Sequence, residues 1–226
     1  MRRKIAAIPV LLLAIATLSG CQAFFTTSLA SGLKRTNVSV PADISNEDAA
    51  AILAGDPSDE MLESLLATLN DQAAAGDTGA ATLAAEAAVQ ASDVSTTVMD
   101  AVASAMNGGD VDITSIVTDL QANTTAEILQ GLTGLGDGTG EIDPAVLIDP
   151  ETGKAKLGST ELVVASLILA SSALPSGVAD PADMDAGQLA AFQADPSVIL
   201  ASKLIAQAAN DGGDASMLDF FSAYLP

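Results

Sequence analysis

The sequence predicts an all-α fold of about nine short, alanine-rich helices, arranged as a bundle or as an α-solenoid-like array. Three observations support this prediction. Apolar residues recur at helical spacing in most segments of the chain. Residues typical of helix N-caps precede these segments, and glycine or proline follows them. Alanine makes up roughly a fifth of the 226 residues, which favours close packing between helices.

The first helices are expected between residues 45 and 106. Residues 45–48 form a capping pattern that opens a short helix ending near Gly55. Asp56-Pro57 predicts the start of a longer helix, since aspartate at the N-cap followed by proline at N1 is a typical helix start, and Gly76 ends it. An alanine-rich helix is expected from about residue 78 to residue 91, and another from residue 92 to residue 106.

The middle of the chain predicts two helices, at 112–120 and 124–132, followed by a glycine-rich loop over 131–158. Two alternatives remain for the end of this loop. Residues 146–157 are compatible with a small β-hairpin with a four-residue turn. Alternatively, Asp143-Pro144 caps a single helical turn. The sequence slightly favours the hairpin.

The last helices are expected at 160–174, 185–193, 195–209 and 214–224. The helix at 160–174 is the most apolar of the chain after residue 20 and is therefore predicted to be central. Its 15 residues are too few to cross a bilayer, which requires about 20. The final segment contains an apolar and aromatic cluster, which indicates either a helix that closes the core or a docking helix for a partner: Met217, Leu218, Phe220, Phe221, Tyr224 and Leu225.

Aspartate precedes proline at five positions, 56, 143, 149, 180 and 195. Much of the negative charge is therefore predicted to serve local capping of helices and turns. Residues 56–58 and 195–197 share the sequence Asp-Pro-Ser, and both are followed by similar apolar residues at matching offsets. This echo indicates either a distant helical repeat or shared capping chemistry, and we favour the second interpretation.

Composition excludes several classes of function. The chain has no histidine, which removes Ser-His-Asp and Cys-His catalysis and the common zinc and haem sites. A single cysteine forms neither an internal disulfide nor an iron–sulfur cluster. The net charge of −21 argues against nucleic acid as a partner, because such binding requires a basic surface.

The N-terminus has the layout of a secretory signal. Three basic residues at 2–4 precede an apolar stretch at 5–18, which is followed by Leu18-Ser19-Gly20-Cys21. These four residues resemble the lipobox of bacterial lipoproteins. The resemblance implies cleavage between Gly20 and Cys21 and lipidation of Cys21. It also implies palmitate-type acyl chains as the membrane anchor, since several chains anchor a protein durably where one does not. Gln22 resembles the residue that follows the lipidated cysteine in outer-membrane lipoproteins.

These observations divide the chain into a signal peptide (1–20), a lipidated N-terminus with a linker (21–44) and an all-helical domain (45–226). Cleavage removes three basic residues and no acidic one, so the charge changes from −21 to −24. Such acidity is typical of proteins from saline habitats. It would also attract cations, cationic peptides or a basic protein partner.

The sequence offers little evidence of chemistry. Asp137, Thr139, Glu141 and Asp143 alternate in the glycine-rich loop, but an EF-hand would need glycine and glutamate where Ile142 and Ile148 stand. A looser calcium site and a solvated loop both remain compatible with this pattern. Pairs of carboxylates, as in glycosidases, carry no information among 29 acidic residues. We therefore expect no catalytic residue, cofactor or metal site, and only Cys21 as a modification site.

The sequence as a whole favours a non-enzymatic protein of the bacterial cell envelope, held on the periplasmic side of the outer membrane by lipid on Cys21. We expect it to act as an interaction or scaffolding module, or as an accessory to assembly or transport, with an envelope protein as partner. The alternatives are a lipoprotein that binds a small ligand or a cation and, less favoured, an envelope hydrolase that uses two carboxylates.

Overall fold

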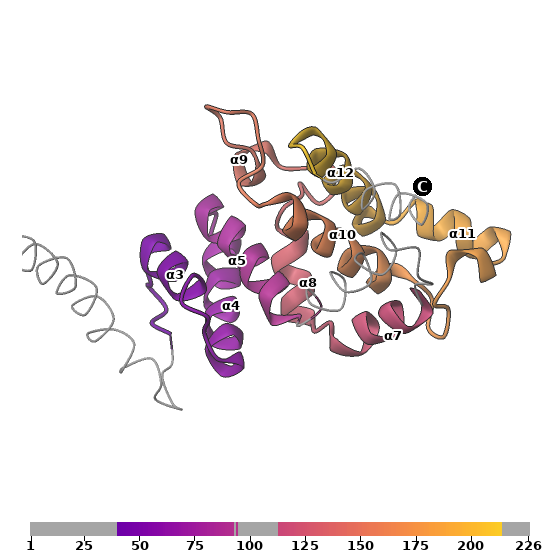
Figure 1. The fold of residues 1–226 in the computed structure, drawn as a ribbon, viewed down its shortest axis with the longest axis horizontal. Helices are drawn as coiled ribbons and strands as arrows, with labels where there is room; N and C mark the ends of the chain where they lie inside the picture. The colour runs from indigo at the N-terminus through magenta and orange to yellow at the C-terminus, as the bar shows by residue number, and fades with distance from the viewer. Residues whose placement is uncertain (1–39, 93, 95–112, 214–226) are drawn as a thin grey trace, which may run out of the picture. The chain divides into compact units, whose positions relative to one another are not determined.

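The computed structural model describes residues 40–92, 94 and 113–213, and it confirms the all-α fold (Figure 1). Those residues form nine α-helices and one short 3-10 helix, with no β-strand among them. The helices are α3 (Asn46–Leu53), α4 (Asp59–Ala74), α5 (Thr78–Ala91), α7 (Ile113–Asn123), α8 (Ala126–Thr133), α9 (Pro144–Leu147), α10 (Ser159–Ala173), η1 (Pro181–Asp183), α11 (Ala186–Gln193) and α12 (Pro196–Asn210). The helices expected at 92–106 and 214–224 lie outside the described residues.

Local capping chemistry sets most helix starts where the sequence predicts them. Ser45 caps α3 by accepting a hydrogen bond from the Asp48 backbone N–H, and Asp77 caps α5 through Ala80. Asp185 and Gln188 form a complete capping box on α11. These bonds satisfy backbone donors that the first helical turn leaves without a partner.

The domain begins earlier than residue 45. Val40 is buried, and its backbone N–H donates to the Ser64 hydroxyl of α4 at 3.1 Å. The Gln72 side chain donates to the carbonyls of Ala42 and Ile44. Residues 40–44, expected in the linker, therefore pack on the helical domain, because they supply an apolar side chain and carbonyl acceptors to α4.

Helices α4 and α5 form a helical hairpin, and α8 packs against both of them. A close approach between these helices lies at Gly131 of α8. A Cβ atom at this position would lie 2.9 Å from the Ala84 carbonyl oxygen and 3.1 Å from the Leu66 side chain. Only glycine allows this contact. The close packing between helices that the small residues of the sequence predict is therefore present at this position.

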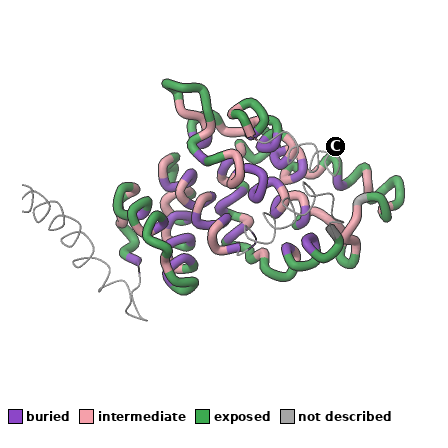
Figure 2. The backbone as a smooth tube through the Cα atoms, viewed as in Figure 1, coloured by how far each residue is buried: buried purple, intermediate pink, exposed green. Residues whose placement is uncertain are grey.

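Helix α10 is central, as its apolar sequence predicts. It packs against α12, α7, α5 and α8, and Figure 2 shows buried backbone along much of its length. Its fully buried side chains come from all sides of the helix: Leu162, Val163, Val164, Ala165, Ile168 and Leu169. A helix that is apolar all round is stable only when neighbours cover every face.

The β-strands of the hairpin expected over 146–157 do not form. Asp143 caps the single turn of α9, with Pro144 at its first position, so the alternative interpretation of this segment is correct. Beyond it the chain turns back with one antiparallel bridge, between Ile148 and Ala155. The Asp149 N–H donates to the Lys154 carbonyl and the Lys156 N–H to the Leu147 carbonyl, so the hairpin is reduced to this single bridge. The Val146 carbonyl instead accepts hydrogen bonds from Thr82 of α5 and from the Lys156 ammonium. Capping and packing on α5 thus outweigh the β-propensity of these residues.

One of the five Asp-Pro dipeptides differs from the other four. Four of the aspartates accept a hydrogen bond from the backbone N–H two residues later: Asp143 from Ala145, Asp149 from Glu151, Asp180 from Ala182 and Asp195 from Ser197. The fifth, Asp56, has a left-handed φ of 54°, and α4 starts after Ser58. The expected start at Asp56 is therefore wrong, and the echo between residues 56–58 and 195–197 does not extend to their local structure.

Candidate functional site

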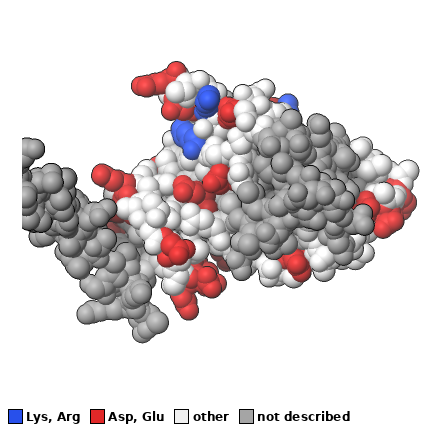
Figure 3. All heavy atoms as spheres, viewed as in Figure 1, with Lys and Arg blue, Asp and Glu red and all other residues white. Residues whose placement is uncertain are grey.

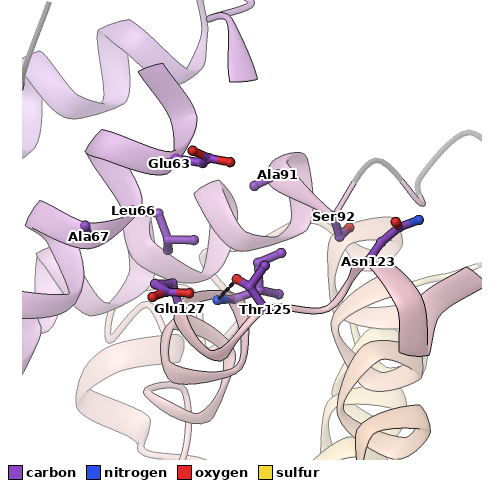
Figure 4. A pocket seen from close by; sticks show the side chains of 9 residues that line it. Glu63, Leu66, Ala67, Ala91, Ser92, Asn123, Thr125 and Glu127 are labelled. Atoms are coloured by element: carbon purple, nitrogen blue, oxygen red, sulfur yellow. Dashed lines mark hydrogen bonds between the residues drawn. The ribbon is translucent and has the colours of Figure 1, made fainter. Parts of the chain in front are cut away.

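A groove lies between α4, the end of α5 and the junction of α7 with α8. It has a volume of about 530 Å³. The described residues that line it are Glu63, Leu66 and Ala67 of α4, Ala91 and Ser92 at the end of α5, and Asn123, Thr125, Glu127 and Ile128 around the α7–α8 junction. We call it the α4–α8 groove (Figure 4).

The floor of the α4–α8 groove is apolar and its rim is polar. Leu66 and Ile128 are only 2% and 3% exposed, whereas Glu63, Ala67 and Glu127 are exposed. In the view of Figure 4, Leu66 lies between the Glu63 side chain and the Glu127 side chain. The groove therefore has a mixed polar and apolar lining, with the Glu63 and Glu127 carboxylates on either side of Leu66.

Most other polar groups of the groove are used within the fold. The Thr125 hydroxyl caps α8 by accepting from the Ile128 N–H, and the buried Ser92 hydroxyl donates to the Val89 carbonyl. The buried Asn70 amide donates to the Glu127 carbonyl at 2.9 Å and ties the start of α8 to α4. These bonds fix the groove walls but leave the Glu63 and Glu127 carboxylates without a hydrogen bond or ion pair inside the described ranges.

A second hollow, of about 510 Å³, lies between the α4–α5 turn, α8 and the glycine-rich loop. Its carboxylates have structural roles. Hydrogen bonds from the Ala80 N–H and from the Asn46 side chain lower the pKa of Asp77. The Thr139 hydroxyl and N–H lower the pKa of Asp137 in the same way, and Asp143 caps α9.

The loosely predicted calcium ligands are accounted for by these local bonds. Asp137 binds Thr139, Asp143 binds the Ala145 N–H, and Glu141 forms an ion pair with Lys203 of α12 at 3.3 Å. Among the described residues, no three acidic, histidine or cysteine side chains are placed to hold a metal ion. The alternation of oxygen-bearing residues in this loop reflects turn geometry.

Among the carboxyl groups that the structure describes, the half-buried Glu86 of α5 has a raised pKa. Burial is the main cause, and the charge of Glu161 on α10 adds to it. Because the folded protein disfavours the charged form, ionisation of Glu86 opposes folding. The penalty is absent below the ordinary pKa of 4.5 and becomes complete as the pH rises through the higher pKa of the folded state.

We therefore expect Glu86→Gln to be more stable than the wild type at about pH 8, with an advantage that shrinks toward about pH 4. Urea unfolding of both proteins across this range measures the difference. Glu60→Gln, at an exposed position of α4, controls for the loss of one negative charge. A Glu86→Gln advantage that stays constant with pH would contradict the assignment.

The predicted modification site, Cys21, and the C-terminal aromatic cluster lie outside the described residues. No single helix of the described part is long and apolar enough to cross a membrane, although α11 and α12, which meet at a bend of 62°, are so as a pair by length and composition. The apolar residues Val198, Ala201 and Leu204 of α12 are fully buried, and α12 packs on α10. Packing within the domain accounts for the apolar character of this helix.

The sequence did not single out Glu63 or Glu127. They lie 64 positions apart, and only the packing of α8 on α4 brings them to one groove. In the sequence, each of the two residues is indistinguishable from an ordinary exposed glutamate of a helix. The signal that was available is the apolar pattern of α4, which places Glu63 at the edge of its buried face beside Leu66.

Comparisons with protein-family models, with curated proteins and with solved structures found no match to this chain.

Proposed function

We propose that this protein is a lipid-anchored helical module of the bacterial cell envelope that acts by non-catalytic interaction with another envelope protein. The observation that carries the proposal is the signal and lipobox pattern ending at Cys21, followed by a chain that begins to pack as a helical domain at Val40. This order is that of a tether followed by a working domain. The similarity of Gln22 to outer-membrane lipoproteins supports the periplasmic face of the outer membrane.

The distance from tether to domain limits where the domain acts. Nineteen residues (21–39) separate the predicted lipid attachment from Val40, and even fully extended they span at most about 65 Å. The domain therefore works within this distance of the membrane surface. Its partner is expected to be a membrane protein or a protein bound close to the same membrane.

The distribution of charge also supports an interaction role. Acidic side chains are spread over the face shown in Figure 3, whereas the lysines visible there are few. Such a surface repels anionic lipid headgroups and nucleic acid. Several aspartates cap helices and turns, and this structural use supports a non-catalytic module over a carboxylate hydrolase.

Metabolic labelling with a palmitate analogue tests the anchor. We expect the wild type to incorporate label and to fractionate with membranes, and Cys21→Ser to do neither, because Cys21 is the single cysteine of the chain. Ser19→Ala keeps the lipobox pattern and is expected to behave as the wild type. Equal labelling of wild type and Cys21→Ser, or a purified wild type that begins at Met1 without acyl chains, would overturn the proposal.

Mild crosslinking in cells, followed by mass spectrometry, tests the interaction role. We expect the wild type to crosslink to an envelope protein and Cys21→Ser to lose that crosslink, because the tether places the domain beside its partner. If the protein is lipidated but forms no specific crosslink, the proposed location stands and the proposed interaction role is refuted.

A further inference from the structure

We propose that the α4–α8 groove binds a basic segment of the envelope partner, in which an arginine or lysine side chain lies over the apolar floor and reaches the Glu63 and Glu127 carboxylates. This inference rests on the proposed interaction role and adds to it a place on the domain and a chemical class of partner.

Glu63 and Glu127 differ from the structural acids of the domain. Asp77, Asp143 and Asp185 each accept backbone hydrogen bonds at a helix start. The carboxylates of Glu63 and Glu127 have no such bond in the part of the chain that the structure describes. Glu127 lies in the first turn of α8, where the helix dipole favours a negative charge, but Glu63 lies inside α4, beyond its first turn. Capping therefore does not explain the position of Glu63.

The lysines of the described domain do not neutralise this groove. Lys203 pairs with Glu141, and Lys156 donates to the carbonyls of Ala145 and Val146. Lys154 lies on the loop after α9, among residues that do not line the groove. Within the described residues, the groove is thus a site of negative charge over an apolar surface, with no internal cation.

Arginine and lysine match this combination better than other groups do. Their aliphatic stems cover apolar surface while the charged head stays at the rim, where it meets carboxylates. The exposed Ala67 and the partly exposed Ala91, above the buried Leu66 and Ile128, suit the stem, and the exposed Glu63 and Glu127 suit the head. Neighbouring apolar residues of a peptide would add contact with Ala67 and Ala91, within a groove of about 530 Å³.

Fluorescence anisotropy with a labelled peptide of alternating arginine and leucine tests the proposal on the full chain as expressed. We expect the wild type to bind this peptide and to bind poorly a peptide with glutamine in place of arginine. The double variant Glu63→Gln/Glu127→Gln is expected to bind the arginine peptide roughly tenfold more weakly, since each exposed ion pair contributes modestly.

A matched control separates the groove from the general acidity of the chain. Glu47→Gln/Glu151→Gln removes the same charge from two exposed positions away from the groove and is expected to bind as the wild type does. Equal weakening in both double variants would overturn the proposal, because it would show that net charge alone attracts the peptide. Absence of wild-type binding would overturn it as well.

A third variant tests the groove without removing a carboxylate. Ala67 is exposed on α4, so Ala67→Arg is expected to fold normally and to occupy the groove with its own cation, which abolishes peptide binding. Retained binding in folded Ala67→Arg would contradict the site. Palmitate labelling of the same variants keeps the two proposals separate. If the groove variants are labelled but bind the peptide as the wild type does, the groove proposal is refuted. If the wild type is not labelled, the anchor proposal is refuted.

Discussion

Leu169→Ala is expected to lower the free energy of unfolding by about 3–5 kcal/mol, the range for leucine truncation at a fully buried site. Leu169 lies in the central helix α10, and its side chain is fully buried. Helices α5, α7, α8 and α12 all pack on α10, so the neighbours of Leu169 are held by several contacts and collapse only partly into the space. The lost burial and the remaining cavity then add together.

Leu167→Ala provides a control with the same chemical change in the same helix. Leu167 is only partly buried, so we expect less than half the loss found for Leu169→Ala. Urea unfolding followed by circular dichroism gives both values. Equal losses at the two positions would show that α10 is not central. The loss would then come from helix propensity, which changes equally in both variants.

The sequence predicts those parts of the fold that depend on a few neighbouring residues. The helix expected at 185–193 starts through a capping box within four positions, and the helix expected at 195–209 starts at Asp195-Pro196 through chemistry confined to three. The central place of α10 follows in the same way, because an apolar face on every side requires cover on every side. Each of these predictions is confirmed by the structure.

The same local rules fail where two outcomes are locally equivalent. Asp56 and Asp195 both precede Pro-Ser, yet Asp195 caps α12 and Asp56 takes a left-handed conformation. Proline disfavours the helical conformation in the residue before it and leaves several others open. At Asp56 the preceding helix has just ended at Leu53, so the chain turns there and α4 starts two residues beyond Pro57.

The candidate site was not predictable because it depends on tertiary contacts between distant residues. Glu63 and Glu127 share a groove only because α8 packs closely on α4 and α5 at Gly131, whose missing side chain leaves room for Leu66 and the Ala84 carbonyl. The raised pKa of Glu86 likewise depends on Glu161 of another helix. Neither the Glu63–Glu127 pair nor the Glu86–Glu161 pair is close enough in the sequence for a spacing pattern to predict it.

Gly140→Ala is expected to lower the free energy of unfolding by about 2–4 kcal/mol, from backbone strain and overpacking together. Gly140 has a φ of 98°, in the region that side chains disfavour. An added Cβ would also lie 2.8 Å from the Ile199 Cβ and 2.9 Å from the Pro196 carbonyl oxygen, both in α12. Because that oxygen belongs to the helix backbone, the contact is relieved only if the loop moves away from α12.

Gly138→Ala separates the two causes. Gly138 also has a positive φ, of 85°, but an added Cβ there would meet no atom within 4 Å. We expect it to show the conformational strain alone, about 1 kcal/mol, in the same urea titration. If the two substitutions cost the same, the glycine-rich loop does not contact α12 at Gly140. A larger loss at Gly140, reduced when Ile199→Ala is added, would instead establish that this loop uses glycine for close approach to α12 as well as for its turns.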